Sequence, residues 1–163
     1  MNHIRIAMQK IPDEFKESIR ETRSMEMAHI IDDFNSEATD LINYLAVITK
    51  KYKVYKESNL ASNMYTLGVA IRHNRELPIL KFSSIAMEHA HEIFTRNEQY
   101  FHHLDIPEGK LGAGDSFTLI KPEIFKKIGA QLTEEEKQPI FDHVTVMATL
   151  SCAYFANTAA SQK

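Results

Sequence analysis

The chain has 163 residues, of which 44% are hydrophobic and 25% are charged, and its formal net charge is −3. This length predicts one domain over residues 1–163, and the composition is that of an average globular protein and argues against disorder. No apolar run approaches the roughly 18 residues that a membrane span needs. A net negative charge argues against a dedicated polyanion binder, whose domain would be clearly basic. The first ten residues lack the apolar core of a secretory signal.

The only cysteine, Cys152, lies in an apolar stretch of the C-terminal region. One cysteine cannot form an intramolecular disulfide, which is typical of a reducing compartment such as the cytoplasm. A small buried hydrophobe needs no redox role. We therefore expect an intracellular protein.

Helical periodicity begins near residue 12. Pro12 and the acidic pair that follows it predict a helix start, with an end near Arg23 or beyond. The clearest apolar stripe runs from Ile30 at three- and four-residue steps and predicts a helix that ends near Lys56.

Two further helices are predicted before residue 100. Ser58 and Asn59 are good cap residues for a helix that runs to His73. Pro78 opens the next helix, whose apolar face continues to Ile93. A short aromatic segment, residues 100–101, follows.

Residues 105–121 include three of the five glycines and have no stable period, so they predict a loop about twice the usual length. A short helix from Pro122 should end at Gly129. Thr133 and Glu136 have the spacing of a capping box, which starts the last helix, and Pro139 means that this helix either kinks or truly begins there.

These elements predict an all-α fold, a single-domain compact helical bundle of five to seven helices with one long glycine-containing loop at about 105–121. The last helix has an unusually wide apolar surface, which suggests a central helix or one that buries a second face against a partner. We expect the loop to act as an adaptable contact and residues 153–160 to form a small-residue surface for close approach. The residues expected in the core or an interface are Ile140, Phe141, Val144, Met147 and Phe155.

Two Glu-x-x-His pairs have the spacing with which helical bundles present ligands to two iron or manganese ions, Glu26 with His29 and Glu88 with His91. The second pair should face solvent, because it falls away from the apolar side of its predicted helix. Further glutamates are needed, and only loose candidates such as Glu37 and Glu123 are available. The sequence 102–105, with two histidines and an aspartate, could also hold a metal ion or simply be a polar helix end.

A basic run at residues 49–56 interleaves lysines with Tyr52 and Tyr55, a composition that can bind phosphates and stack on bases. If this run is helical, Lys51 lies apart from the other lysines, and the run can equally be a solvated helix end whose tyrosines pack inward. A third helix that returns beside the second would extend the patch. The residues of this predicted patch are Lys50, Lys51, Lys53, Lys56, Arg72 and Arg75.

Several segments between residues 77 and 150 resemble a pattern in small uncharacterised helical proteins of nucleocytoplasmic large DNA viruses. The resemblance implies a viral origin and an all-helical fold, and it supplies no catalytic residues. It makes a virion or replication-associated structural role more plausible than a metabolic one. The segments that carry it are Leu77–Phe82, Ile93–Phe101, Ile124–Ile128, Leu132–Lys137 and the pair Ile140 and Phe141.

We therefore expect a non-enzymatic structural or interaction protein that presents helical faces to itself or to another protein. This hypothesis includes a homo-oligomer and no cofactor. A nucleic-acid-associated protein and a di-metal bundle remain the alternatives.

Overall fold

The computed structural model describes residues 8–98 and 127–161, with the side chain of Ile85 left aside. Six helices lie wholly within these ranges, and the described residues contain no strand. They are α2 (Asp13–Arg23), α3 (Met27–Lys51), α4 (Leu60–His73), α5 (Leu77–Ala86), α6 (Ala90–Phe94) and α9 (Glu134–Ser161). The all-α prediction is therefore confirmed. No helix in the described ranges is both long and apolar enough to cross a bilayer.

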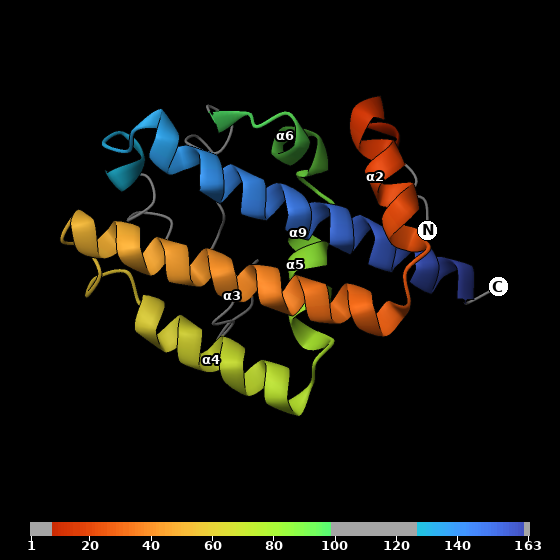
Figure 1. Cartoon of the computed structure of the whole chain (residues 1–163), viewed down its shortest axis with the longest axis horizontal. Helices are drawn as coiled ribbons and strands as arrows, with labels where there is room; N and C mark the ends of the chain where they lie inside the picture. The colour runs from red at the N-terminus through yellow and green to blue at the C-terminus, as the bar shows by residue number, and fades with distance from the viewer. Residues whose placement is uncertain (1–7, 99–126, 162–163) are drawn as a thin grey trace.

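The two longest helices, α3 and α9, lie side by side through the middle of the molecule (Figure 1). α9 also packs against α2, α5 and α6, whereas α4 packs against α3 and α5. The wide apolar surface of the last helix is thus covered by four helices of the same chain, as the central-helix prediction required. From Met147 to Tyr154 every residue except Thr149 is buried.

α9 begins at the capping box that the sequence predicts. The Thr133 hydroxyl accepts a hydrogen bond from the Glu136 amide at 3.1 Å, and the Glu136 carboxylate accepts one from the Thr133 amide at 3.0 Å. The alternative start at Pro139 is wrong, because Pro139 lies inside the helix.

α3 ends at Lys51, five residues before the predicted end at Lys56. The cause is a Schellman motif, in which the Val54 amide donates to the Thr49 carbonyl at 2.8 Å and Lys53 adopts a left-handed φ of 60°. Glycine or asparagine usually marks that position, so the lysine gave no stop signal. The turn buries Val54 in the core.

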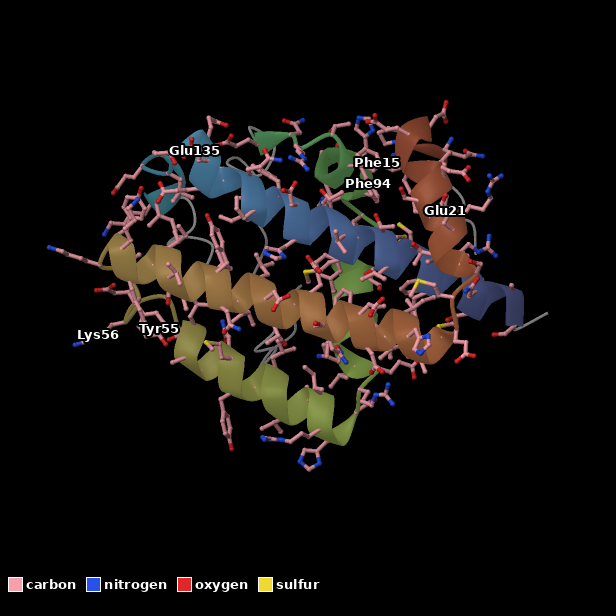
Figure 2. All side chains as sticks on the ribbon, in the orientation of Figure 1. Phe15, Glu21, Tyr55, Lys56, Phe94 and Glu135 are labelled. Carbon is pink, nitrogen blue, oxygen red and sulfur yellow. The ribbon has the colours of Figure 1, made fainter. Side chains whose placement is uncertain are left out.

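The prediction of one helix from Pro78 through Ile93 is wrong. A turn at residues 87–89 divides this segment into α5 and α6. After this turn α6 contacts α2, and the centroids of the Phe94 and Phe15 rings lie 4.8 Å apart (Figure 2). Residues 127–129 are helical and end at Gly129, as predicted. The segments 100–101, 102–105, 105–121 and 122–126 lie outside the described residues.

Candidate functional site

Four of the five apolar residues that the sequence assigned to a core or interface belong to the core or pack against it. Ile140 and Met147 are buried in the core, and Val144 and Phe155 are half-buried against it. Phe141 is half-buried. Ala153 is fully buried, so the small-residue segment 153–160 begins inside the molecule rather than on its surface.

The lysines of the predicted nucleic-acid patch surround the end of α3. The Lys50 ammonium lies 4.6 Å from the centre of the Tyr55 ring, which is a cation–π contact within the chain. Lys50, Lys53 and Lys56 would share one face only if the helix continued to Lys56. Because α3 ends before Lys53, this shared face does not form. Figure 2 shows Lys56 and Tyr55 at this end of the molecule.

Glu136 neutralises part of this end. Its carboxylate lies 2.7 Å from the Lys51 ammonium and accepts a 2.6 Å hydrogen bond from the Tyr52 hydroxyl. The hydrogen bonds from Lys51, from the Thr133 amide and from Tyr52 lower the pKa of Glu136 to about 2. The side chains of Lys51 and Tyr52 therefore bind Glu136 within the fold and are not free to bind a ligand.

The two arginines of the predicted patch lie at the other end of α4. α4 runs back along α3, as the extended patch required, but this places Arg72 about 18 Å along the helix from Leu60. Arg72 and Arg75 line a pocket together with Ala28 and Ile31 from the start of α3. The six basic residues therefore form two separate groups, and the single patch is wrong.

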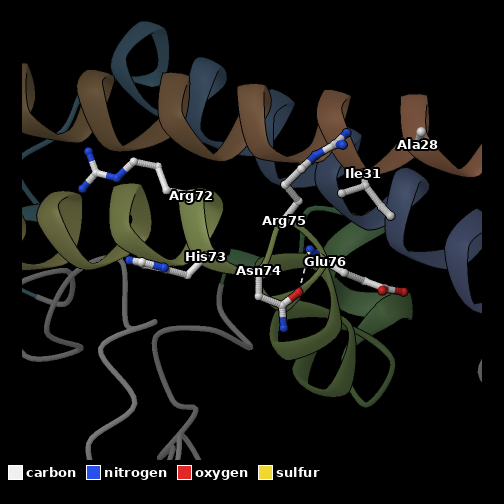
Figure 3. Close-up of a pocket in the computed structure, with 7 residues that line it drawn as sticks. All are labelled: Ala28, Ile31, Arg72, His73, Asn74, Arg75 and Glu76. Atoms are coloured by element: carbon white, nitrogen blue, oxygen red, sulfur yellow. Dashed lines mark hydrogen bonds between the residues drawn. The ribbon is translucent and has the colours of Figure 1, made fainter.

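That pocket is an open depression of about 430 Å³, which we call the corner pocket (Figure 3). Its two acidic neighbours are already paired: Arg75 binds Asp32, and the Tyr154 hydroxyl donates to Glu76. Burial, followed by the hydrogen bond to Glu76, raises the pKa of Tyr154 to about 12. The lining residues are Ala28, Ile31, Arg72, His73, Asn74, Arg75 and Glu76.

These contacts give the corner pocket a structural role. The Asn35 side chain of α3 donates to the Arg75 carbonyl at 2.9 Å, so α3 holds the connection between α4 and α5. Tyr154 ties the same connection to α9 through Glu76. Among the basic residues of the lining, Arg75 binds Asp32, whereas Arg72 and His73 are exposed and have no ion pair within the described residues.

The described residues contain no group of three or more potential metal ligands, so within them the two Glu-x-x-His pairs do not come together. The di-metal site stays a prediction, because its candidate Glu123 lies outside the described residues. Glu26, His29, Glu88 and His91 are all exposed. His91 contacts the Lys10 carbonyl through Nδ1 at 2.9 Å, outside any such group. The loose candidate Glu37 instead contacts Nδ1 of His143 on α9 at 2.6 Å.

A surface that sequence reasoning missed lies on α4. Ala61, Tyr65, Gly68 and Arg72 recur at steps of four, three and four residues, so they follow one side of the helix, and we call them the α4 stripe. Tyr65 is 72% exposed, the most of any large hydrophobic residue in the described ranges. The spacing alone was available as a signal, but it does not tell an outward stripe from an inward one.

The comparison with known proteins gives one informative relative. The chain is 30% identical over 153 residues to a protein of Acanthamoeba polyphaga mimivirus that is described only as uncharacterised, and the match covers 93% of this chain and 85% of the relative. The chain belongs to this viral protein family. The resemblance to uncharacterised proteins of nucleocytoplasmic large DNA viruses is thereby confirmed. No protein-family model matches the chain. No solved structure matches it either.

Proposed function

We propose that the protein is a non-enzymatic viral protein that acts by binding protein through the α4 stripe. The observation that carries this proposal is Tyr65, a large aromatic side chain left 72% exposed on a helix with few charges. Tyrosine and arginine are enriched where proteins bind one another, and most other charged residues are depleted there. The α4 stripe has this composition.

The outer surface of α2 provides the contrast. Of its eight exposed residues seven are charged, and Ser18 is the exception. α4 has one Arg and no Lys, Asp or Glu in fourteen residues. Two helices at the periphery of one bundle therefore differ in surface chemistry, and only α2 has the composition of an ordinary solvated face.

The viral family supports a role in the particle or in replication. We place the protein among the structural and interaction components of the virus rather than its metabolic enzymes. In this view α9 organises the fold and α4 presents the contact surface, which moves the proposed interface away from Phe141 and Phe155.

The test uses site-specific photo-crosslinking of the full chain in the cells that naturally express it. A photo-reactive residue at Ala61, one turn from Tyr65, should give discrete protein adducts, whereas the same residue at Ser18 on α2 should not. Adding Tyr65→Asp should remove the adducts at position 61. Equal labelling at both positions, or adducts that survive Tyr65→Asp, would contradict a binding role for the α4 stripe.

A further inference from the structure

Gly68 stands in the middle of α4, where the fold gives no reason for a glycine. Glycine inside a helix is less favourable than alanine because the unfolded chain loses more backbone freedom. A Cβ built at Gly68 meets no heavy atom within 4 Å among the described residues. Packing inside the chain therefore leaves room for a larger residue at this position. A glycine does, however, allow the backbone of a second helix to approach the α4 stripe closely, because Gly68 has no Cβ.

The residues on either side of Gly68 are complementary to each other. Tyr65 lies three residues before it and Arg72 four residues after it, both exposed on the same stripe. Arg72 has no ion pair among the described residues. A guanidinium binds favourably over the face of a tyrosine ring within about 6 Å.

Two copies of α4 that cross antiparallel at Gly68 bring Tyr65 of one chain against Arg72 of the other, and two-fold symmetry makes this contact twice. A parallel pair would instead place the two arginines together, which is repulsive. The stripe is thus self-complementary in one orientation.

We infer that the partner of the α4 stripe is a second copy of this chain, in a two-fold dimer whose α4 helices cross antiparallel at Gly68 with reciprocal Tyr65–Arg72 contacts. This inference rests on the proposed function and names its partner. The dimer leaves the α2 surface free.

The first test is disulfide trapping of the full chain. Gly68→Cys places two thiols beside the two-fold axis, and mild oxidation should give a covalent dimer of the 18.7 kDa chain on a non-reducing gel. The natural Cys152 is 1% exposed and stays silent. Ser18→Cys on α2 is the matched control. Trapping of Gly68→Cys no faster than Ser18→Cys would overturn the crossing point.

The second test is a swap measured by sedimentation equilibrium. Tyr65→Arg alone and Arg72→Tyr alone should each weaken the dimer by at least about tenfold, because each removes both reciprocal contacts. The double variant restores an arginine–tyrosine pair in the reverse order and should regain most of the affinity. A double variant as weak as the singles, with unchanged circular dichroism, would overturn the pairing.

The two proposals can fail separately. A wild-type chain that stays monomeric, while position 61 still labels other proteins, would refute the dimer and keep the interaction role. Loss of both the dimer and the adducts at position 61 would refute both proposals.

Discussion

At the residue scale, Glu136 shows how one carboxylate joins separate parts of the chain. It belongs to the first turn of α9, and it binds Lys51 and Tyr52 at the end of α3 while completing its own capping box. The donors surround the charged form, and this lowers the pKa of Glu136 to about 2. Ionised Glu136 therefore strengthens the contact between the end of α3 and the start of α9.

Glu136→Gln should lower the melting temperature at neutral pH. Since the pKa of Glu136 falls from 4.5 to about 2 on folding, its contribution is complete above about pH 4.5 and is lost as the pH falls to about 2. The two proteins should therefore converge in stability near pH 2. Thermal melts across this range measure it, with exposed Glu135→Gln as the control. A constant difference at all pH values would contradict the role of the charge.

Cys152 should be chemically inert in the folded protein. Burial raises the pKa of its thiol to about 12, so almost no thiolate exists at neutral pH. A colorimetric thiol reagent should react with it only after denaturant is added. Reaction at the rate of a free thiol under native conditions would show that α9 opens.

At the element scale, two positions hold residues that do not suit their local backbone, one just after α3 and one inside α4. Lys53 holds a left-handed φ of 60° after the end of α3, and Gly68 sits in regular helix in the middle of α4. In each case another residue type would suit the backbone better, glycine at position 53 and alanine at position 68. The first has a reason in the turn that buries Val54. The second has none within the described chain.

Lys53→Gly should stabilise the protein by about 1 kcal/mol, because glycine adopts the left-handed conformation without the steric cost that other residues meet. Urea unfolding monitored by circular dichroism measures the change. The control is Lys56→Gly, at a residue outside the set with positive φ. A loss of stability in Lys53→Gly would show that its side chain contributes more than its backbone costs.

Gly68→Ala should stabilise the monomer by about 0.5 to 1 kcal/mol, as expected for a helix interior with open space. Chemical unfolding at low protein concentration measures this change. The same substitution adds a methyl group at the proposed crossing point, so the two effects should have opposite signs. A destabilised monomer would show that Gly68 serves packing within the chain.

The sequence predicted helix positions better than helix ends. Caps that use common residues were visible, such as Thr133 with Glu136. The end of α3 was missed because the left-handed position holds Lys53, and the break after α5 was missed because the apolar period continues across it.

The candidate surface was harder to predict than the fold. The distribution of Tyr65 and Gly68 on α4 follows the same period as a core stripe. Only the structure shows that Ala61, Tyr65 and Arg72 on this side are exposed and that Gly68 between them is partly exposed. The prediction of one basic patch did not hold for a similar reason. The direction in which α4 runs places Arg72 far from Lys56, and sequence spacing does not reveal that direction.

At the scale of the whole molecule, α9 is the element on which the others depend. It packs against α2, α3, α5 and α6, and its buried side chains include Met147 and Tyr154. The T-shaped pair of Tyr154 and Phe155, with centroids 5.8 Å apart, extends this core. Substitutions here should act on folding before they act on any partner.

Phe155→Asp should therefore unfold the protein rather than yield a folded monomer, because it places a charge against the core. Met147→Ala should cost roughly 2 to 5 kcal/mol, the range for deleting a buried side chain of this size. Guanidinium melts report both, and Val146→Ala at a 43% exposed position of α9 is the control. A Phe155→Asp variant with native helicity and an unchanged melting temperature would reassign Phe155 to a surface.

The position of α9 in chain order affects how the protein is made. A ribosome releases α2 to α6 first, and the partner that covers the long apolar side of α3 follows more than 80 residues after α3 ends. Contacts between distant segments form late and slow the folding of a chain, even when every element is a helix. During synthesis the early helices therefore lack the helix that covers much of their apolar side, and we expect the nascent chain to bind chaperones until α9 has emerged.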